Sequence, residues 1–101
     1  MAIETRTSRN ASLISQLIDR YAVEHQWGVD DYVVYVVPNE DWGRYLVVVK
    51  CNRFELRDEA TYNKEIRSYL KEALIESPSF FRSIDLDVIS LNGPFAFLDP
   101  R

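Results

Sequence analysis

Two residues, His25 and Cys51, carry side chains that could act as a general base or a nucleophile. His25 is the only histidine and stands at the end of an expected helix, where an imidazole commonly interacts with the helix dipole. Cys51 is the only cysteine and ends a run of valines, which favours a small buried side chain over a nucleophile. Nothing in the spacing places the two together, so we expect no Cys–His dyad and no catalytic residues.

The acidic residues do not form a metal-binding pattern. Two pairs, Asp30–Asp31 and Glu40–Asp41, flank opposite ends of an expected strand that is about 23 Å long, so they cannot share one ion. Asp85 and Asp87 point to one face of another expected strand and could bind a cation weakly. Charges on a strand also discourage aggregation, and we favour that role. We therefore expect no metal and no cofactor.

One pattern resembles the restriction-endonuclease-like core, in which a helix with a glutamate precedes a hairpin that carries an acid-x-Lys motif. Lys50 fits the lysine of that motif, but Val48 stands where the metal-binding carboxylate would be. Without that ligand the two-metal chemistry has no anchor. One strand of that core is missing as well. An inactive relative of the nuclease-like fold stays open as an alternative.

Hydrophobic periodicity predicts the elements that position these residues. Apolar residues recur with helical spacing from Leu13 to Tyr21, which predicts a helix over about residues 9–25 that Gly28 stops. Residues 31–38 and 44–51, rich in valine and tyrosine, predict an antiparallel hairpin. A second helix should run from an N-cap at Asp58 to residue 77, before Pro78. Residues 84–91 predict a third strand.

The predicted class is α+β, with the element order α-β-β-α-β. A length of 101 residues fits one small domain, 1–101, with a three-stranded, mainly antiparallel sheet and two helices on one face. Residues 1–7 are expected to be a loose leader and 92–101 an apolar tail.

This order, with the run of residues 45–54, resembles the BolA and type II KH topology. The histidine of the BolA family has no counterpart after the second strand. The small, acidic chain is also similar to secretion-chaperone-like folds. These resemblances concern the fold, and they transfer no functional residue.

The composition excludes several classes of protein. The net charge of −4 argues against a general nucleic-acid or membrane-surface binder. Only three glycines exclude the glycine-rich phosphate loops, and one cysteine excludes a disulfide framework or a cysteine-rich zinc site. No apolar run reaches the roughly 18 residues of a spanning helix, and no apolar run follows the first residues as in a secretory signal. We expect a cytoplasmic protein without membrane contact.

Basic residues are concentrated in one part of the chain, because residues 44–71 carry a charge of +3 and the remainder −7. Lys64, Arg67 and Lys71 have the spacing of one helix flank, which could contact phosphates. The alternative function is therefore a nucleic-acid-binding module. Its contacts would be Arg53, Arg57, Lys64, Arg67 and Lys71.

The first strand is apolar on both faces, and two helices can cover only one face of a small sheet. The other face would stay exposed unless the apolar tail or another subunit covers it. Trp42, in a polar turn, is expected to be exposed. These features favour a non-enzymatic protein-interaction module, a small regulator, adaptor or chaperone-like subunit that binds a protein partner or a second copy as a homodimer. The predicted contacts are Trp42, Tyr35, Val33, Val37, Phe95 and Phe97.

Overall fold

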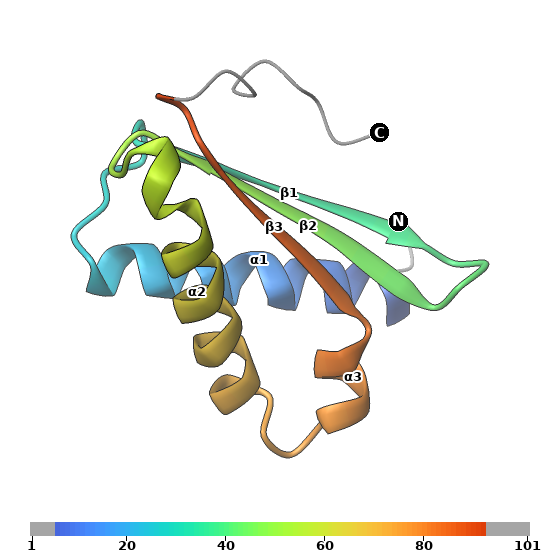
Figure 1. The fold of residues 1–101 in the computed structure, drawn as a ribbon. Coiled ribbons are helices and arrows are strands. Elements are labelled where there is room, and N and C mark those ends of the chain that lie inside the picture. The colour runs from blue at the N-terminus through green and yellow to red at the C-terminus, as the bar shows by residue number, and fades with distance from the viewer. Residues whose placement is uncertain (1–5, 93–101) are drawn as a thin grey trace.

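The computed structural model describes residues 6–92, so the predictions for residues 1–5 and 93–101, Phe95 and Phe97 among them, lie outside the described residues. The described elements confirm the α+β class and the order α-β-β-α-β, with two short helices added (Figure 1). They are α1 (Arg6–Glu24), β1 (Tyr32–Asn39), β2 (Arg44–Cys51), the 3-10 helix η1 (Leu56–Asp58), α2 (Glu59–Ala73), α3 (Pro78–Arg82) and β3 (Ile84–Ser90).

The three strands form a mixed sheet in the order β1-β2-β3. β1 and β2 form the predicted antiparallel hairpin, with Tyr32 opposite Cys51 and Asn39 opposite Arg44. β3 pairs with β2 in parallel, with Tyr45 opposite Ile84 and Cys51 opposite Ser90. The parallel pairing is possible because α2 and α3 carry the chain back before β3 begins. All the helices lie on one side of the sheet (Figure 1).

The core lies between the sheet and the helices. In β2 the core-facing residues alternate along the strand, as Cys51 shows by sharing its face with Val47 and Val49. Ile14 and Ile18 of α1 and Ile66 and Leu70 of α2 pack against them, and each such buried side chain contributes about 1.5–3 kcal/mol. Cys51 has no exposed surface, as expected for a small buried residue.

The ends of α1 differ from the prediction. Arg6 and Thr7, inside the predicted leader, are already helical, and the C-terminus of α1 does not use Gly28. Gln26 adopts a left-handed conformation with φ of 61°. Its N–H donates to the Val23 carbonyl at 3.0 Å, and the Trp27 N–H donates to Ala22 at 2.9 Å. These bonds form a Schellman motif, which turns the chain so that Trp27 enters the core.

The second helix also departs from the prediction at its ends. Asp58 occupies the N-cap position but makes no capping bond with its side chain, because η1 directly precedes the helix. α2 ends at Ala73 rather than at residue 77. Pro78 stands in the first turn of α3, where its missing N–H costs no hydrogen bond. The segment between the second helix and the third strand therefore contains a short helix, α3.

Candidate interaction surface

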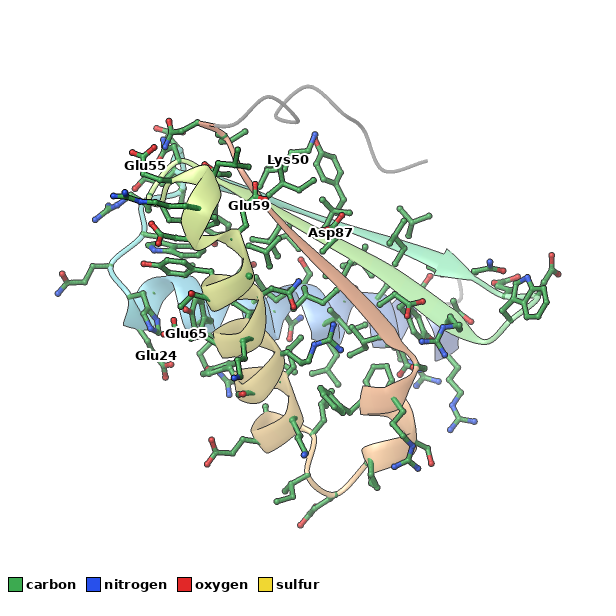
Figure 2. The ribbon with its side chains drawn as sticks, viewed as in Figure 1. Glu24, Lys50, Glu55, Glu59, Glu65 and Asp87 are labelled. Carbon is green, nitrogen blue, oxygen red and sulfur yellow. The ribbon has the colours of Figure 1, made fainter. Side chains whose placement is uncertain are left out.

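The face of the sheet opposite the helices carries the side chains that alternate with the core residues. From the register, β1 contributes Val33, Tyr35 and Val37, which we call the valine face. Asp85 and Asp87 of β3 are exposed on the same side, as predicted. In Figure 2 the side chains of Lys50 and Asp87 lie on the side of the sheet away from α1.

Exposure on this side is greatest at the edge strands. Val33 and Val37 are 39% and 38% exposed, whereas Val48 and Lys50 of the central strand are each 4% exposed. The Lys50 ammonium lies 5.5 Å from the centre of the Tyr35 ring, a cation–π distance. The sequence predicts that the face opposite the helices stays exposed unless the apolar tail or another subunit covers it. Among the described residues of the two hairpin strands, the exposed valines of this face belong to β1.

The turn of the hairpin continues this surface. Trp42 is 77% exposed, as predicted, and follows Glu40 and Asp41. Val37 and Leu46 line an open hollow of about 600 Å³ beside the turn, together with both carboxylates. The hairpin end therefore combines apolar side chains with two carboxylates.

The backbone of β1 is paired on one side only. Asn52 donates its N–H to the Asp31 carbonyl at 2.9 Å, which continues the ladder between β1 and β2. In an antiparallel ladder every second residue of a strand bonds the same neighbouring strand. Since Asp31 bonds toward β2, the peptide groups of Val33, Tyr35 and Val37 also point toward β2. The peptide groups of Tyr32, Val34 and Val36 point outward. No strand of the described sheet lies beyond them, and we call these three residues the open edge.

The outer side of β3 is occupied by α2. The Asn63 side-chain amide donates to the Leu86 carbonyl at 3.2 Å. The Ser90 N–H donates to the Glu59 carboxylate at 2.6 Å. Figure 2 shows Glu59 near the C-terminal end of β3. Leu86 and Ser90 alternate with the β3 residues that bond β2, so their peptide groups point away from β2. Side chains of α2 satisfy these outward groups of β3, whereas the outward peptide groups of β1 stay open.

Carboxylates stand at both ends of β1. Asp31 accepts a bond from the Gly28 N–H at 2.7 Å and pairs with Arg53 at 3.2 Å, and these two contacts lower its pKa. Asp30, Glu40 and Asp41 are exposed and take part in neither ion pair that residues 6–92 form, Arg53–Asp31 and Arg44–Asp85. The ends of the open edge therefore carry negative charge.

The basic residues that the sequence predicts as nucleic-acid contacts lie in different surroundings. The Arg53 guanidinium donates to the Asp31 carboxylate and to the Gln26 carbonyl. Arg57 is exposed in η1, and the lysines and arginine of α2 are exposed. Glu65 and Glu72 line the same groove as Lys64, so carboxylates interrupt the positive charge. The nucleic-acid contacts stay a prediction.

His25 lies in an open groove of about 590 Å³ between α1 and α2. Its ring stacks on Tyr21 at 3.9 Å between centroids, and its Nδ1 donates to the Tyr21 carbonyl at 2.9 Å. The Tyr21 hydroxyl donates to Glu65 at 3.1 Å, and burial together with this bond raises the pKa of Tyr21 well above its usual value.

Reactive and metal-binding groups are scarce in the described part of the chain. Burial raises the pKa of the Cys51 thiol, which disfavours the nucleophilic thiolate. Val48, where a nuclease would need a carboxylate, is buried. Between residues 6 and 92 no group of three or more histidine, cysteine or acidic side chains is close enough to hold a metal ion.

Comparisons with known proteins give no match, whether to protein families, to curated proteins or to solved structures. None of the helices among residues 6–92 has the length and apolar character needed to cross a membrane.

Proposed function

We propose that this chain is a non-enzymatic protein-binding module that contacts its partner through the valine face and Trp42. The observation that carries the proposal is that Val33, Val37 and Trp42 are exposed together on one hairpin. Among residues 6–92 the other exposed large apolar residues are spread over separate parts of the chain: Leu13 and Val23 in α1, Val29 before β1, Leu56 in η1, Ile75 after α2 and Leu91 after β3. Isolated exposed residues are ordinary, whereas a group of them favours an interaction site.

The side chains that could support catalysis are engaged elsewhere. Cys51 is buried, Nδ1 of His25 is bonded to a backbone carbonyl, and Glu65 accepts the Tyr21 hydroxyl. An enzyme of this size would have to use these groups or the exposed carboxylates of β3. Binding through the hairpin surface needs no acid, base or nucleophile. An exposed tryptophan suits this role, because tryptophan often contributes much of the free energy of binding at an interface.

The test compares two exposed apolar residues of nearly equal exposure. Trp42 is 77% exposed and Ile75 is 73% exposed, and both lie outside helices and strands. The tagged full chain, Trp42→Ala and Ile75→Ala would each be used to capture proteins from the host, with and without nuclease. We expect Ile75→Ala to retain a partner that Trp42→Ala captures at least about tenfold less, since truncating such a residue often costs 2 kcal/mol or more.

Two results would contradict the proposal. Equal capture by the wild type and Trp42→Ala would remove the hairpin tip from the contact. Nucleic acid in the eluate, with captured proteins lost after nuclease treatment, would favour the alternative that uses the basic residues of α2. Unfolding curves of both variants show whether a loss of capture arises from the surface or from the fold.

A further inference from the structure

We propose that the partner adds a β-strand to the open edge, and that this strand is apolar with basic residues at both ends. The inference rests on the proposed function and specifies how the partner is recognised. In such strand addition, backbone hydrogen bonds provide affinity and alternate side chains provide specificity. Three observations support it: the outward backbone groups of β1, the side chains beside them and the charges at the two ends.

The backbone observation sets the length of the added strand. Tyr32, Val34 and Val36 each direct an N–H and a carbonyl outward. Pro38 is the next residue in this alternation, and it has no N–H to donate. Its position leaves the pairing with β2 intact and ends the row of outward donors. A partner strand therefore has three donors available, which fits a strand of about five or six residues.

The side chains of β1 favour an apolar partner. Residues 32–37 contain no charged residue, glycine or proline. An added strand would place alternate side chains beside Val33 and Val37, which are partly exposed, and the others beside the half-buried Val34 and Val36. Native proteins commonly protect an edge of this kind with charged residues, and between residues 32 and 37 this edge has none.

The charges favour basic residues at the ends of the partner strand. Asp30 precedes β1, and Glu40 and Asp41 follow it, all three exposed. Of the carboxylates at the two ends of β1, Arg53 forms an ion pair with Asp31 and with no other. Lysine or arginine at both ends of an added strand would stand beside these carboxylates whichever way the strand runs. Such charges contribute chiefly to specificity and to the rate of association.

The same charges disfavour a second copy of this chain as the occupant. A closed two-fold dimer through β1 requires antiparallel pairing of the two strands. That pairing would bring Asp30 of each copy toward Glu40 and Asp41 of the other. Like charges opposite each other destabilise an interface, and each chain also carries a net charge of −4.

The experiment uses the full chain and two synthetic peptides, each a short alternation of valine and threonine. One peptide carries paired lysines at both ends and the other carries paired glutamates. Titration followed by NMR gives the affinity, and amide hydrogen exchange locates the contact. We expect the lysine peptide to slow exchange at Tyr32, Val34 and Val36, while Val33 and Tyr35, already bonded to β2, change little. The glutamate peptide should bind at least about tenfold more weakly.

Two variants make the test specific. Val34→Pro removes one outward N–H without removing a bond to β2, and it should weaken the lysine peptide about tenfold. If its spectrum shows loss of the fold, the double variant Glu40→Lys and Asp41→Lys replaces it. The double variant leaves the edge intact and should narrow or reverse the preference between the two peptides.

Several outcomes would overturn the inference. Absence of protection along the open edge would exclude strand addition, and equal affinity for both peptides would exclude the proposed charge recognition. Protection of the same amides in a concentration-dependent dimer would make a second copy the occupant. A captured partner that is lost in Trp42→Ala and kept in Val34→Pro would leave the proposed function standing and refute strand addition. A partner insensitive to both variants would refute both proposals.

Discussion

The two edge strands of the sheet, β1 and β3, differ in what contacts their outward backbone groups and in the charge of their side chains. On the outer side of β3, Asn63 and Glu59 of α2 bond to the backbone of Leu86 and Ser90. β3 also carries exposed charges at Asp85 and Asp87. On the outer side of β1 no described strand pairs with the backbone, and residues 32–37 carry no charge.

This difference follows from the path of the chain. α2 lies between β2 and β3 in sequence, so it packs beside β3, and its side chains reach that backbone. α1 contacts β1 through the Tyr32 hydroxyl, which donates to Asp19 at 2.7 Å. Burial and this bond raise the pKa of Tyr32 to about 12. This contact fixes the Tyr32 side chain and leaves the outward peptide groups of β1 open. The edge of β1 is therefore available for pairing, whereas α2 side chains bond the corresponding edge of β3.

Proline substitutions at Val33 and Val34 should have very different effects on stability, and this is the largest effect we expect. The Val33 N–H faces β2, and the Val34 N–H faces outward. Val33→Pro should lower the free energy of unfolding by about 3 kcal/mol, because it removes a bond within the ladder. Val34→Pro should cost about 1 kcal/mol. Urea unfolding measures both values.

The two valines are neighbours in one strand, so each variant is the control for the other. The more buried of the two, Val34, is predicted to tolerate proline better. A larger loss for Val34→Pro would show that the alternation of outward and inward peptide groups is the reverse of the one described. Equal losses would show that the direction of the N–H does not set the cost of proline, and either result would contradict the comparison between the edges.

The sequence predicted the local elements well because their signals are local. The bounds of β2 are those expected, since its valine run is preceded by Gly43 in a positive-φ turn. Alternation placed Cys51 in the core and Asp85 and Asp87 on the solvent side. The alternation of β3 fits either pairing direction, so its parallel pairing was not predicted. The end of α1 lies within one residue of the predicted one, but Gln26 and not Gly28 adopts the left-handed conformation there, and no local pattern indicates that Trp27 enters the core directly afterwards.

The candidate site was predicted in part. The alternation along the strand predicted that Val33, Tyr35 and Val37 share one face, and the polar turn predicted that Trp42 is exposed. The open edge could not be predicted, because it depends on β2 being the central strand and on α2 lying beside β3. From the sequence, the acidic pairs around β1 are too far apart to bind one metal ion and indicate no other role. Their proposed role in recognition follows only from the structure, in which they flank an open strand.

Removing the α2 contacts should make the β3 edge resemble the β1 edge. Glu59→Ala deletes the acceptor of the Ser90 N–H, and Asn63→Ala deletes the donor to Leu86. Each should lower the free energy of unfolding by about 1 kcal/mol, and Glu59→Ala should raise hydrogen exchange at the Ser90 amide about tenfold. Urea unfolding and amide exchange measure these effects.

Glu72→Ala is the matched control, since Glu72 is exposed on the same helix. It should change neither stability nor exchange at Ser90. Unchanged exchange at Ser90 in Glu59→Ala would mean that the carboxylate does not protect this edge, and that the two edges are more alike than their contacts indicate.

The smallest effect concerns the charge on β3. Arg44 donates from Nε to Asp85 at 2.8 Å, and this hydrogen bond lowers the pKa of the Asp85 carboxyl. Because the pKa is lower in the folded state, the pair stabilises the fold above the pKa of the unfolded chain, about 4, and this stabilisation is lost as the pH falls through the folded pKa. Asp85→Asn should therefore reduce the loss of stability between pH 7 and pH 3.

Both groups of this pair are exposed, so the change should be a small shift in the urea midpoint, and added salt should reduce it. Asp87→Asn removes a carboxylate from the same face and serves as the control. If both variants change the pH dependence equally, the effect comes from the total charge of β3 and not from its pairing with β2. In that case the exposed face of β3 would differ from the uncharged β1 through its total charge, and the guanidinium contact would contribute nothing to that difference.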